Sequence, residues 1–406
     1  MKHTKRYPWL VVALLWFVAL LNYMDRQMLS TMRDAMQIDI AELSSAERFG
    51  NLMAIFLWIY ALMSPLAGSI ADRVSKKWLI VGSLFVWSSV TLLMGFCTTY
   101  QQIYWLRALM GVSEALYIPA GLALIAEYHT GKSRSLAIGL HMTGLYMGQA
   151  IGGFGATVAH HFSWQSTFFS FGVIGVIYSI VLVLLLHDKE KEQVEVKEPS
   201  QSFSLASIKD FFRVFTVLLS NISFWIILFY FAAPSLPGWA IKNWLPTLFQ
   251  ESLGVDMSIA GPISTITIAI SSFIGVIIGG TLSDKWVQKN LKGRIYTSAI
   301  GLSMTIPSLL ILGLLSGEIA IFAGVLFGIG YGMFDANNMP ILCQFIPSKS
   351  RATAYGILNL VGVAAGAYVT QLLGRFSDNG NLGEGFALLC GVVLLALCLQ
   401  LYFLRP

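Results

Sequence analysis

The sequence predicts an all-α membrane protein with twelve transmembrane helices in two six-helix, pseudo-symmetric halves. Three observations lead to this fold class: an apolar composition, twelve runs long enough to cross a bilayer, and a short motif that occurs twice. The motif places a glycine, an acid and a basic residue at the end of an apolar run, first in Gly68–Lys77 and again in Gly280–Lys285. A duplicated helix–turn–helix junction in so apolar a chain indicates a two-halved membrane transporter.

The composition identifies the bilayer as the solvent of this chain. Hydrophobic residues make up 56% and charged residues 12%, whereas soluble domains carry about 25% charged residues. The first apolar run continues from Trp9 to Met24 with no small-residue cleavage site behind it, so we expect a retained helix and not a signal peptide. The four cysteines lack CxxC spacing, which favours packing over metal binding. We expect no metal, no cofactor and no nucleic-acid partner.

A spanning helix needs about 20 apolar residues, and twelve runs meet that need. A polar stretch separates the sixth run from the seventh, so we predict an N-terminal bundle over 1–186, a cytoplasmic linker over 187–218 and a C-terminal bundle over 219–406. Within the linker, 203–215 has the pattern of a short helix on the membrane surface. The predicted spans are 9–30, 48–71, 78–97, 103–126, 136–158, 165–186, 219–248, 259–282, 294–315, 318–345, 352–374 and 386–404.

The basic residues predict the orientation. With the N-terminus inside, 20 of the 26 Lys and Arg residues fall in inner segments, and only 3 fall in outer loops. This asymmetry follows the positive-inside rule. We therefore expect a multi-pass protein of the inner (plasma) membrane whose two termini and linker are cytoplasmic. The other three basic residues, Arg26, Arg107 and Lys242, lie inside predicted spans.

Charged residues inside the bilayer are costly and mark functional sites by default. Asp25 and Arg26 lie in the first span, and Arg107 and Glu114 lie in the fourth. Arg107 and Glu114 are two turns apart and share a helix face, as do Asn22 and Arg26. The functional interpretation is a site for substrate and coupling ion. The structural alternative is two ion pairs that lock the first and fourth spans together.

The paired junctions, the twelve spans and the central linker resemble the major facilitator superfamily of secondary transporters over essentially the whole chain. Gly148–Gly153 in the fifth span is similar to the glycine-rich motif of that family, although Gln149 stands where the motif usually has proline. The same glycines also allow two helices to pack closely. The resemblance implies the major facilitator fold and transport by alternating access.

A second pattern narrows the resemblance. Asn-Tyr-Met-Asp-Arg ending at Arg26, followed by Arg-x6-Glu ending at Glu114, resembles the anion:cation symporter branch, which includes hexuronate, aldonate and sialic acid carriers. Those transporters couple uptake to protons. The resemblance implies that Asp25 and Glu114 are the protonatable carboxylates, while Arg26 and Arg107 hold a substrate carboxylate or tune the acids. An arginine fork suits a carboxylate because it binds it bidentately.

The duplicated junctions are the predicted inner gate. An acid at the cytoplasmic end of a span can meet basic groups of the next loop and the positive N-terminal ends of neighbouring helices. Such contacts would hold the inner side shut while the carrier faces outward. The alternative is that the same charges only anchor the loop and set the topology. The gating candidates are Gly68, Asp72 and Arg73 at the first junction and Gly280, Asp284 and Lys285 at the second.

The C-terminal half adds polar groups suited to a sugar. Asp335, Asn337 and Asn338 precede Pro340, where an interrupted helix can expose backbone groups to a cavity. Lys242 follows two prolines in the seventh span; it is either a second anion contact or, as we favour, a residue that reaches the outer interface. The substrate-binding candidates are Asn22, Tyr23, Arg26, Arg107, Tyr146, Gln149, Lys242, Asp335, Asn337, Asn338 and Asn359.

Together these features favour a proton-coupled symporter that imports a small organic anion, most consistent with a sugar acid such as a hexuronate, an aldonate or a sialic acid. Sodium stays open as the coupling ion. No Walker loop or HExxH motif is present, and we expect neither an enzyme nor catalytic residues. One alternative is a Spinster-like lysolipid or sphingolipid carrier, which the first- and fourth-span motifs also resemble. Another is a non-transporting membrane receptor. We expect a monomer whose partners are the anion and the bilayer.

Overall fold

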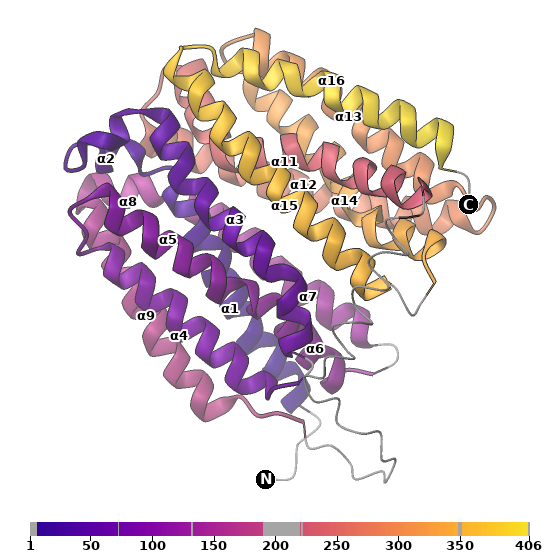
Figure 1. Ribbon diagram of the computed structural model, residues 1–406, viewed down its shortest axis with the longest axis horizontal. Helices are drawn as coiled ribbons and strands as arrows, with labels where there is room; N and C mark the ends of the chain where they lie inside the picture. Colours follow the sequence, from indigo (N-terminus) through magenta and orange to yellow (C-terminus); the bar gives the residue numbers. More distant parts are fainter. Residues whose placement is uncertain are drawn as a thin grey trace.

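The chain is helical throughout the part that the structure describes. This computed structural model describes residues 6–71, 73–130, 133–189, 220, 222–347 and 351–404. Within those ranges there is no β-strand, and eleven helices are long and apolar enough to cross a membrane. The predicted all-α membrane fold is therefore confirmed. Figure 1 shows two groups of roughly aligned helices side by side, the first in indigo to magenta and the second in salmon to yellow.

The first group follows the predicted spans of the N-terminal half. Its helices are α1 (Tyr7–Leu29), α2 (Arg33–Met36), the 3-10 helix η1 (Ala41–Ser44), α3 (Ala46–Ala71), α4 (Lys76–Met94), α5 (Tyr100–Ala115), α6 (Tyr117–Tyr128), α7 (Arg134–Gly152), α8 (Gly155–His161) and α9 (Trp164–Leu185). The predicted fourth span is divided into α5 and α6, and the predicted fifth span is divided into α7 and α8. The predicted fourth span is confirmed as one candidate membrane span, Tyr100–Tyr128, with a turn at Leu116. A single continuous helix is wrong for the fifth span, although α7 and α8 together cover its predicted range.

The second group covers the C-terminal half. Its helices are α11 (Ile222–Leu253), α12 (Met257–Val287), α13 (Gly293–Leu314), α14 (Ile319–Phe345), α15 (Arg351–Asp378) and α16 (Leu382–Phe403). The interruption expected near Pro340 is wrong, because α14 continues through this proline. A proline inside a helix removes one backbone hydrogen bond without necessarily ending the helix. The predicted linker lies almost entirely outside the described residues, as does 203–215, so the domain boundaries stay a prediction.

Glycines bring α7 unusually close to α1. A Cβ atom on Gly148 would lie 2.2 Å from the carbonyl oxygen of Leu20, and one on Gly144 would lie 2.5 Å from that of Trp16. Only glycine permits such a backbone approach, which is how small residues promote helix packing in membranes. The second group uses the same device, because a Cβ atom on Gly275 of α12 would lie 2.2 Å from a carbonyl oxygen of α14.

Contacts between the two groups gather where α1 ends and α3 begins, which is the outer end in the predicted orientation. The Asp378 carboxylate, at the end of α15, accepts hydrogen bonds from the Ser45 hydroxyl at 2.8 Å and from the backbone N–H groups of Ala46 at 2.5 Å and Glu47 at 2.9 Å. Arg375 also pairs with Glu47 at 2.8 Å. These contacts hold the outer ends of α3 and α15 together.

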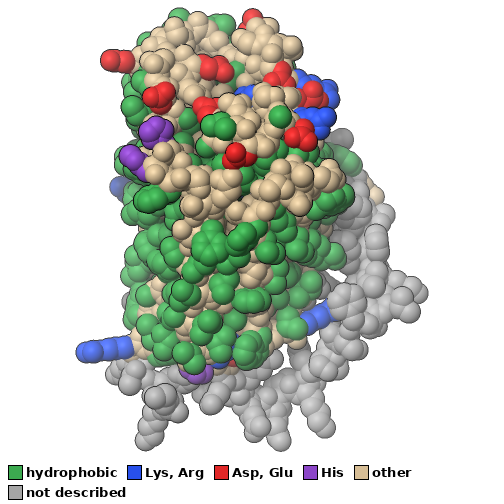
Figure 2. Space-filling view, turned by 90° about the vertical axis from the view of Figure 1, so that its left-hand side faces the viewer, with side chains coloured by type: hydrophobic (Ala, Val, Ile, Leu, Met, Phe, Trp, Pro, Cys, Tyr) green, Lys and Arg blue, Asp and Glu red, His purple; other side chains and the backbone are tan. Residues whose placement is uncertain are grey.

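The surface matches a bilayer environment. Figure 2 shows hydrophobic side chains over the middle of one face, while acidic side chains gather at its upper end. The large exposed apolar residues include Phe85 on α4 and Ile177, Ile180 and Leu184 on α9. Contact with lipid tails is favourable for such side chains, whereas contact with water is unfavourable. The protein is therefore a multi-pass membrane protein.

Candidate functional site

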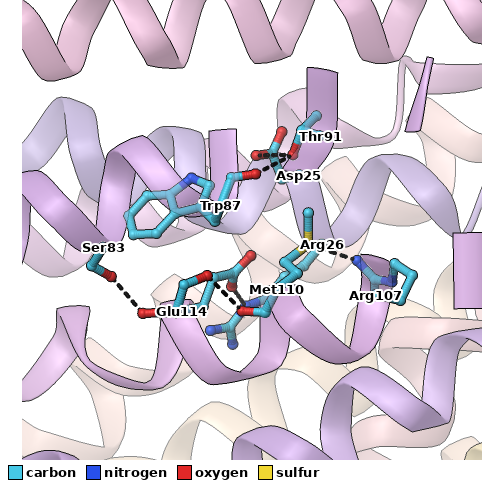
Figure 3. Close-up of polar contacts among 9 residues, drawn as sticks. Asp25, Arg26, Ser83, Trp87, Thr91, Arg107, Met110 and Glu114 are labelled. Atoms are coloured by element: carbon cyan, nitrogen blue, oxygen red, sulfur yellow. Dashed lines mark hydrogen bonds and ion pairs between the residues drawn. The ribbon is translucent and has the colours of Figure 1, made fainter. Parts of the chain in front are cut away.

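An ion pair joins α1 to α5 in the interior of the first group. The Arg26 Nε atom lies 2.5 Å from Glu114 Oε2, and the Glu114 side chain is 0% exposed. The pair is drawn in Figure 3 with the neighbouring polar residues of α4 and α5. A charge-assisted contact this short in a dry setting is strong, yet it only compensates for the cost of removing both charges from water. The pair therefore adds little net stability, and a change in either charge would disturb this balance.

Aromatic rings enclose the Arg26 guanidinium. Its Cζ atom lies 4.6 Å from the ring centroid of Tyr60, 4.9 Å from that of Phe56 and 5.0 Å from that of Tyr23. Each ring face attracts the cation, most strongly where water is excluded. Of the atoms described, none accepts a hydrogen bond from the Nη2 atom of Arg26. Arg26 thus retains donor capacity beyond its contact with Glu114.

Arg107 lies on the same helix as Glu114 but does not form an ion pair within the described part of the chain. Its side chain is 2% exposed, donates to the Met110 sulfur at 3.1 Å and lies 4.7 Å from the Phe56 ring centroid. The structural alternative of two ion pairs therefore holds for one pair only. An arginine buried without a carboxylate is costly, which is typical of a functional position.

Asp25 occupies a separate polar position beside the ion pair. It is 5% exposed and accepts a hydrogen bond from the Thr91 hydroxyl of α4 at 3.1 Å. The fully buried Asn22 lies one turn earlier on α1 and next to Glu114. Two carboxylates and two arginines therefore cluster inside the first group, from α1 and α5. In such a cluster the protonation of one carboxylate changes the charge balance felt by both arginines.

A cavity of about 90 Å³ lies between the two groups of helices. This volume is below the roughly 300–1,000 Å³ of open small-molecule sites, so the site would have to widen to admit a sugar-sized ligand. Five predicted site residues line it together with residues that the sequence reasoning did not select. The lining comprises Tyr23, Met142, Leu145, Tyr146 and Gln149 from the first group and Gly238, Ile241, Lys242, Ile268, Ser272, Phe327, Tyr331, Gly332 and Asp335 from the second.

The outer-interface placement of Lys242 is wrong. Lys242 lines the central cavity, and its Nζ atom lies 4.8 Å from the Trp239 ring centroid. The reason is the length of α11, which continues about three turns past Lys242 to Leu253 and so keeps the lysine away from the helix end. The other interpretation of Lys242, a basic residue available to an anion, fits this position.

The three C-terminal asparagines lie outside the cavity lining. Asn337 is fully buried and donates to the Met333 carbonyl at 2.9 Å. Asn338 donates to Asp335 Oδ1 at 3.1 Å, so it supports a lining residue from behind. Asn359 of α15 donates to the Ser64 hydroxyl of α3 at 3.0 Å and thereby bridges the two groups. These amides bond to protein, which is a common role for amides in membrane helices.

The structure describes more of the second junction than of the first. Asp72 lies outside the described residues, Gly68 is partly buried near the end of α3, and Arg73 is exposed. At the second junction, Asp284 pairs with Arg294 of α13 at 2.7 Å, whereas Lys285 is exposed. Gly68 and Gly280 have open space where a Cβ atom would be. The acid of the second junction thus meets a basic group beyond the next loop, and gating by either junction stays a prediction.

Several residues of the site were not predicted from the sequence. Tyr331 and Ser272 line the cavity, and Thr91 holds Asp25. Gln27 is buried and donates to the backbone carbonyl of Lys242 at 2.9 Å, which connects α1 to α11. Hydroxyl and amide residues are frequent in membrane helices, so type alone does not mark these positions. For Gln27, which follows Arg26 directly, and Tyr331, one turn before Asp335, that neighbourhood was the available signal, whereas Ser272 and Thr91 had none.

Two groups of membrane helices around a central cavity lined by charged, polar and apolar residues are typical of a membrane transporter of the two-bundle type. The model of the Major Facilitator Superfamily matches residues 15–370, so the chain belongs to that superfamily.

Similar proteins extend this assignment over the whole chain. The "Probable galactarate/D-glucarate transporter GudP" of Escherichia coli is 22% identical, with 96% of this chain and 91% of the relative covered. The "Hexuronate transporter" of Bacillus subtilis is 23% identical, with 98% and 94% covered. Among solved structures, a bacterial homolog of the human lysosomal transporter Spinster, inward-facing and occupied, aligns with a TM-score of 0.78 at 18% identity, covering 98% of this chain and 97% of that one. The structural likeness concerns the fold alone.

Proposed function

We propose that the protein is a proton-coupled symporter that imports a small organic anion, most consistent with a sugar acid, by alternating access. The observation that carries the proposal is one cavity that joins a basic residue, Lys242, to hydroxyl, amide and carboxyl groups from both helix groups. The relatives named for hexuronate and for galactarate and glucarate support the same substrate class. We propose further that it acts as a monomer in the inner membrane with both termini in the cytoplasm.

The geometry suits an exchange of partners at Arg26. Tyr23 contacts the Arg26 guanidinium and also lines the cavity, so the arginine lies directly behind the cavity wall. A proton taken up by Glu114 would remove the counter-charge of Arg26. The arginine fork could then bind a substrate carboxylate bidentately. Asp25, the second carboxylate of the cluster, is the other proton acceptor in this proposal, and the coupling ion is H+.

The cavity chemistry supports a sugar acid over a lipid. The hydroxyl groups of Tyr146 and Tyr331, the amide of Gln149 and the carboxylate of Asp335 line it from both sides. A polyol needs such partners, because each substrate hydroxyl that leaves water unpaired costs affinity. A lysolipid chain would instead desolvate these groups without replacing their hydrogen bonds. The Spinster-like carrier is therefore the second candidate, supported by the fold likeness and by the resemblance of the first- and fourth-span motifs.

Transport in proteoliposomes tests the proposal. We expect saturable accumulation of radiolabelled glucuronate or gluconate when the outside is more acidic, and its collapse on addition of a protonophore. Accumulation driven by a sodium gradient without a pH gradient would refute the proton assignment. Saturable binding without uphill accumulation would indicate a receptor, and movement of lysolipids alone would indicate the lipid carrier.

Variants test the two coupling carboxylates. Asp25→Asn and Glu114→Gln should each lower proton-driven accumulation by about tenfold or more, while at least one of them retains substrate exchange. Glu42→Gln is the matched control, because Glu42 is an exposed acid of η1, remote from the cavity lining. If both site variants kept full proton-driven accumulation, Asp25 and Glu114 would not be the coupling groups.

A further inference from the structure

Two opposite charges line the cavity from the second group of helices. Lys242 projects from α11 and Asp335 from α14. Within the described part of the chain, neither residue takes part in an ion pair. If the two residues formed an ion pair with each other, neither charge would be available to a ligand. Here the cavity presents one positive and one negative group to a ligand.

Asp335 is exposed although it lies near the middle of α14, far from both helix ends. Its Oδ1 atom accepts the hydrogen bond from Asn338, and its side chain borders the cavity. An acid at this depth would be costly if it faced lipid, so its exposure is to the cavity. A carboxylate accepts hydrogen bonds and does not donate them. Asp335 is therefore suited to hydroxyl groups and repels a second carboxylate.

The opposite wall adds polar groups without adding charge. Tyr23, Tyr146 and Gln149 line it, and the Arg26–Glu114 pair lies behind Tyr23. The positive side of the cavity is thus set by Lys242 and by Arg26 behind the wall. The only acid in the cavity lining described by the structure is Asp335.

We propose that the cavity selects sugar acids with a single carboxylate, and that Asp335 rejects those with a carboxylate at each end. This inference rests on the proposed function and specifies its substrate class. An aldonate places its carboxylate at the basic groups and its terminal hydroxyl at Asp335, whereas an aldarate of the same length brings its second carboxylate to Asp335. Like charges at close range in a cavity of low dielectric repel strongly. The relatives include proteins named for both kinds of acid, so the names alone leave the choice open.

Calorimetric titration of the purified full chain at pH 7 tests the selection. Gluconate and glucarate form a matched pair of six-carbon ligands that differ only at the far end. We expect the wild-type protein to bind gluconate about tenfold or more tightly than glucarate. Asp335→Asn should reduce that ratio to about threefold or less by raising the affinity for glucarate. Asp335→Glu, which keeps the charge, should retain the wild-type preference.

Glu384→Gln is the matched control, because Glu384 is an exposed acid at the start of α16 and not part of the cavity lining. It should keep the wild-type ratio. Equal affinities of the wild-type protein for the two acids would overturn the inference, as would an unchanged ratio in Asp335→Asn. Equal wild-type affinities would refute the inference without any variant, so it stays falsifiable even if an Asp335 variant does not fold. Equal proton-driven uptake of both acids would refute the selection but leave the transport proposal intact; binding of neither would refute both.

Discussion

Breaking the Arg26–Glu114 ion pair should show how strongly the contributions of its two residues to the free energy of unfolding are coupled. Glu114→Gln leaves the Arg26 guanidinium buried without its counter-charge, and the loss of one partner of a buried pair costs about 3–5 kcal/mol. Three aromatic rings lie within 5.0 Å of the guanidinium in the wild type and in the variant alike, so they do not offset this cost. We therefore expect a loss of about 3–5 kcal/mol for Glu114→Gln.

The double variant should be far less damaging than the single variants suggest. Replacing both residues, as in Arg26→Met with Glu114→Leu, removes the desolvation cost together with the attraction, and such replacements are often neutral or stabilising. The free energies of unfolding of the wild type, Arg26→Met, Glu114→Leu and the double variant form a cycle. We expect a coupling energy of about 2 kcal/mol or more from equilibrium unfolding in mixed micelles, followed by tryptophan fluorescence.

An exposed ion pair provides the control for this cycle. Asp284 and Arg294 are joined at 2.7 Å, but the Asp284 side chain is 65% exposed. The corresponding cycle should give a coupling energy below about 1 kcal/mol, because water screens the pair. If the Arg26 and Glu114 changes proved additive to within about 0.5 kcal/mol, the argument from burial would be refuted. Equal coupling in the two cycles would contradict it too.

Three further predictions concern other parts of the molecule. Gly148→Ala places a Cβ atom 2.2 Å from the Leu20 carbonyl and should cost about 1–3 kcal/mol in the same unfolding assay, whereas Gly139→Ala, with open space, should be neutral or stabilising by up to about 1 kcal/mol. Asp378→Asn weakens three hydrogen bonds at the outer end, so spin labels on the outer ends of α3 and α15 should report a new, longer distance. Lys242→Gln should weaken gluconate binding about tenfold in calorimetric titration, with less than about 0.5 kcal/mol change in stability.

Length and apolarity made the fold predictable. A spanning helix must satisfy its backbone internally over about 20 residues, so each apolar run could be assigned on its own. The turns within the fourth and fifth spans, near Leu116 and Gly153, were missed because they leave the average hydropathy of a run almost unchanged. Helix α7 is not among the eleven apolar spans, because glycines and polar residues such as Gln149 lower its hydropathy.

The members of the site were more predictable than their partners. The cost of charge in a bilayer singled out Asp25, Arg26, Arg107 and Glu114 without any structure. Helix periodicity shows that Arg107 and Glu114 share a face, but it does not reveal which neighbouring helix that face meets. The structure pairs Glu114 with Arg26 instead. Tertiary contacts between spans depend on packing across the bundle, which a single sequence does not encode locally.

Three consecutive residues of α1 connect the charged cluster to the other half of the molecule. Asp25 meets Thr91 of α4 at 3.1 Å, Arg26 meets Glu114 at 2.5 Å, and Gln27 donates to the Lys242 carbonyl of α11 at 2.9 Å. Successive helix residues point about 100° apart, so one turn of α1 reaches three different elements. Because glycines of α7 bring its backbone close to that of α1, we expect the two helices to move together. A shift of α1 caused by a new charge at residue 25 or 114 would therefore act directly on the helix that carries Lys242.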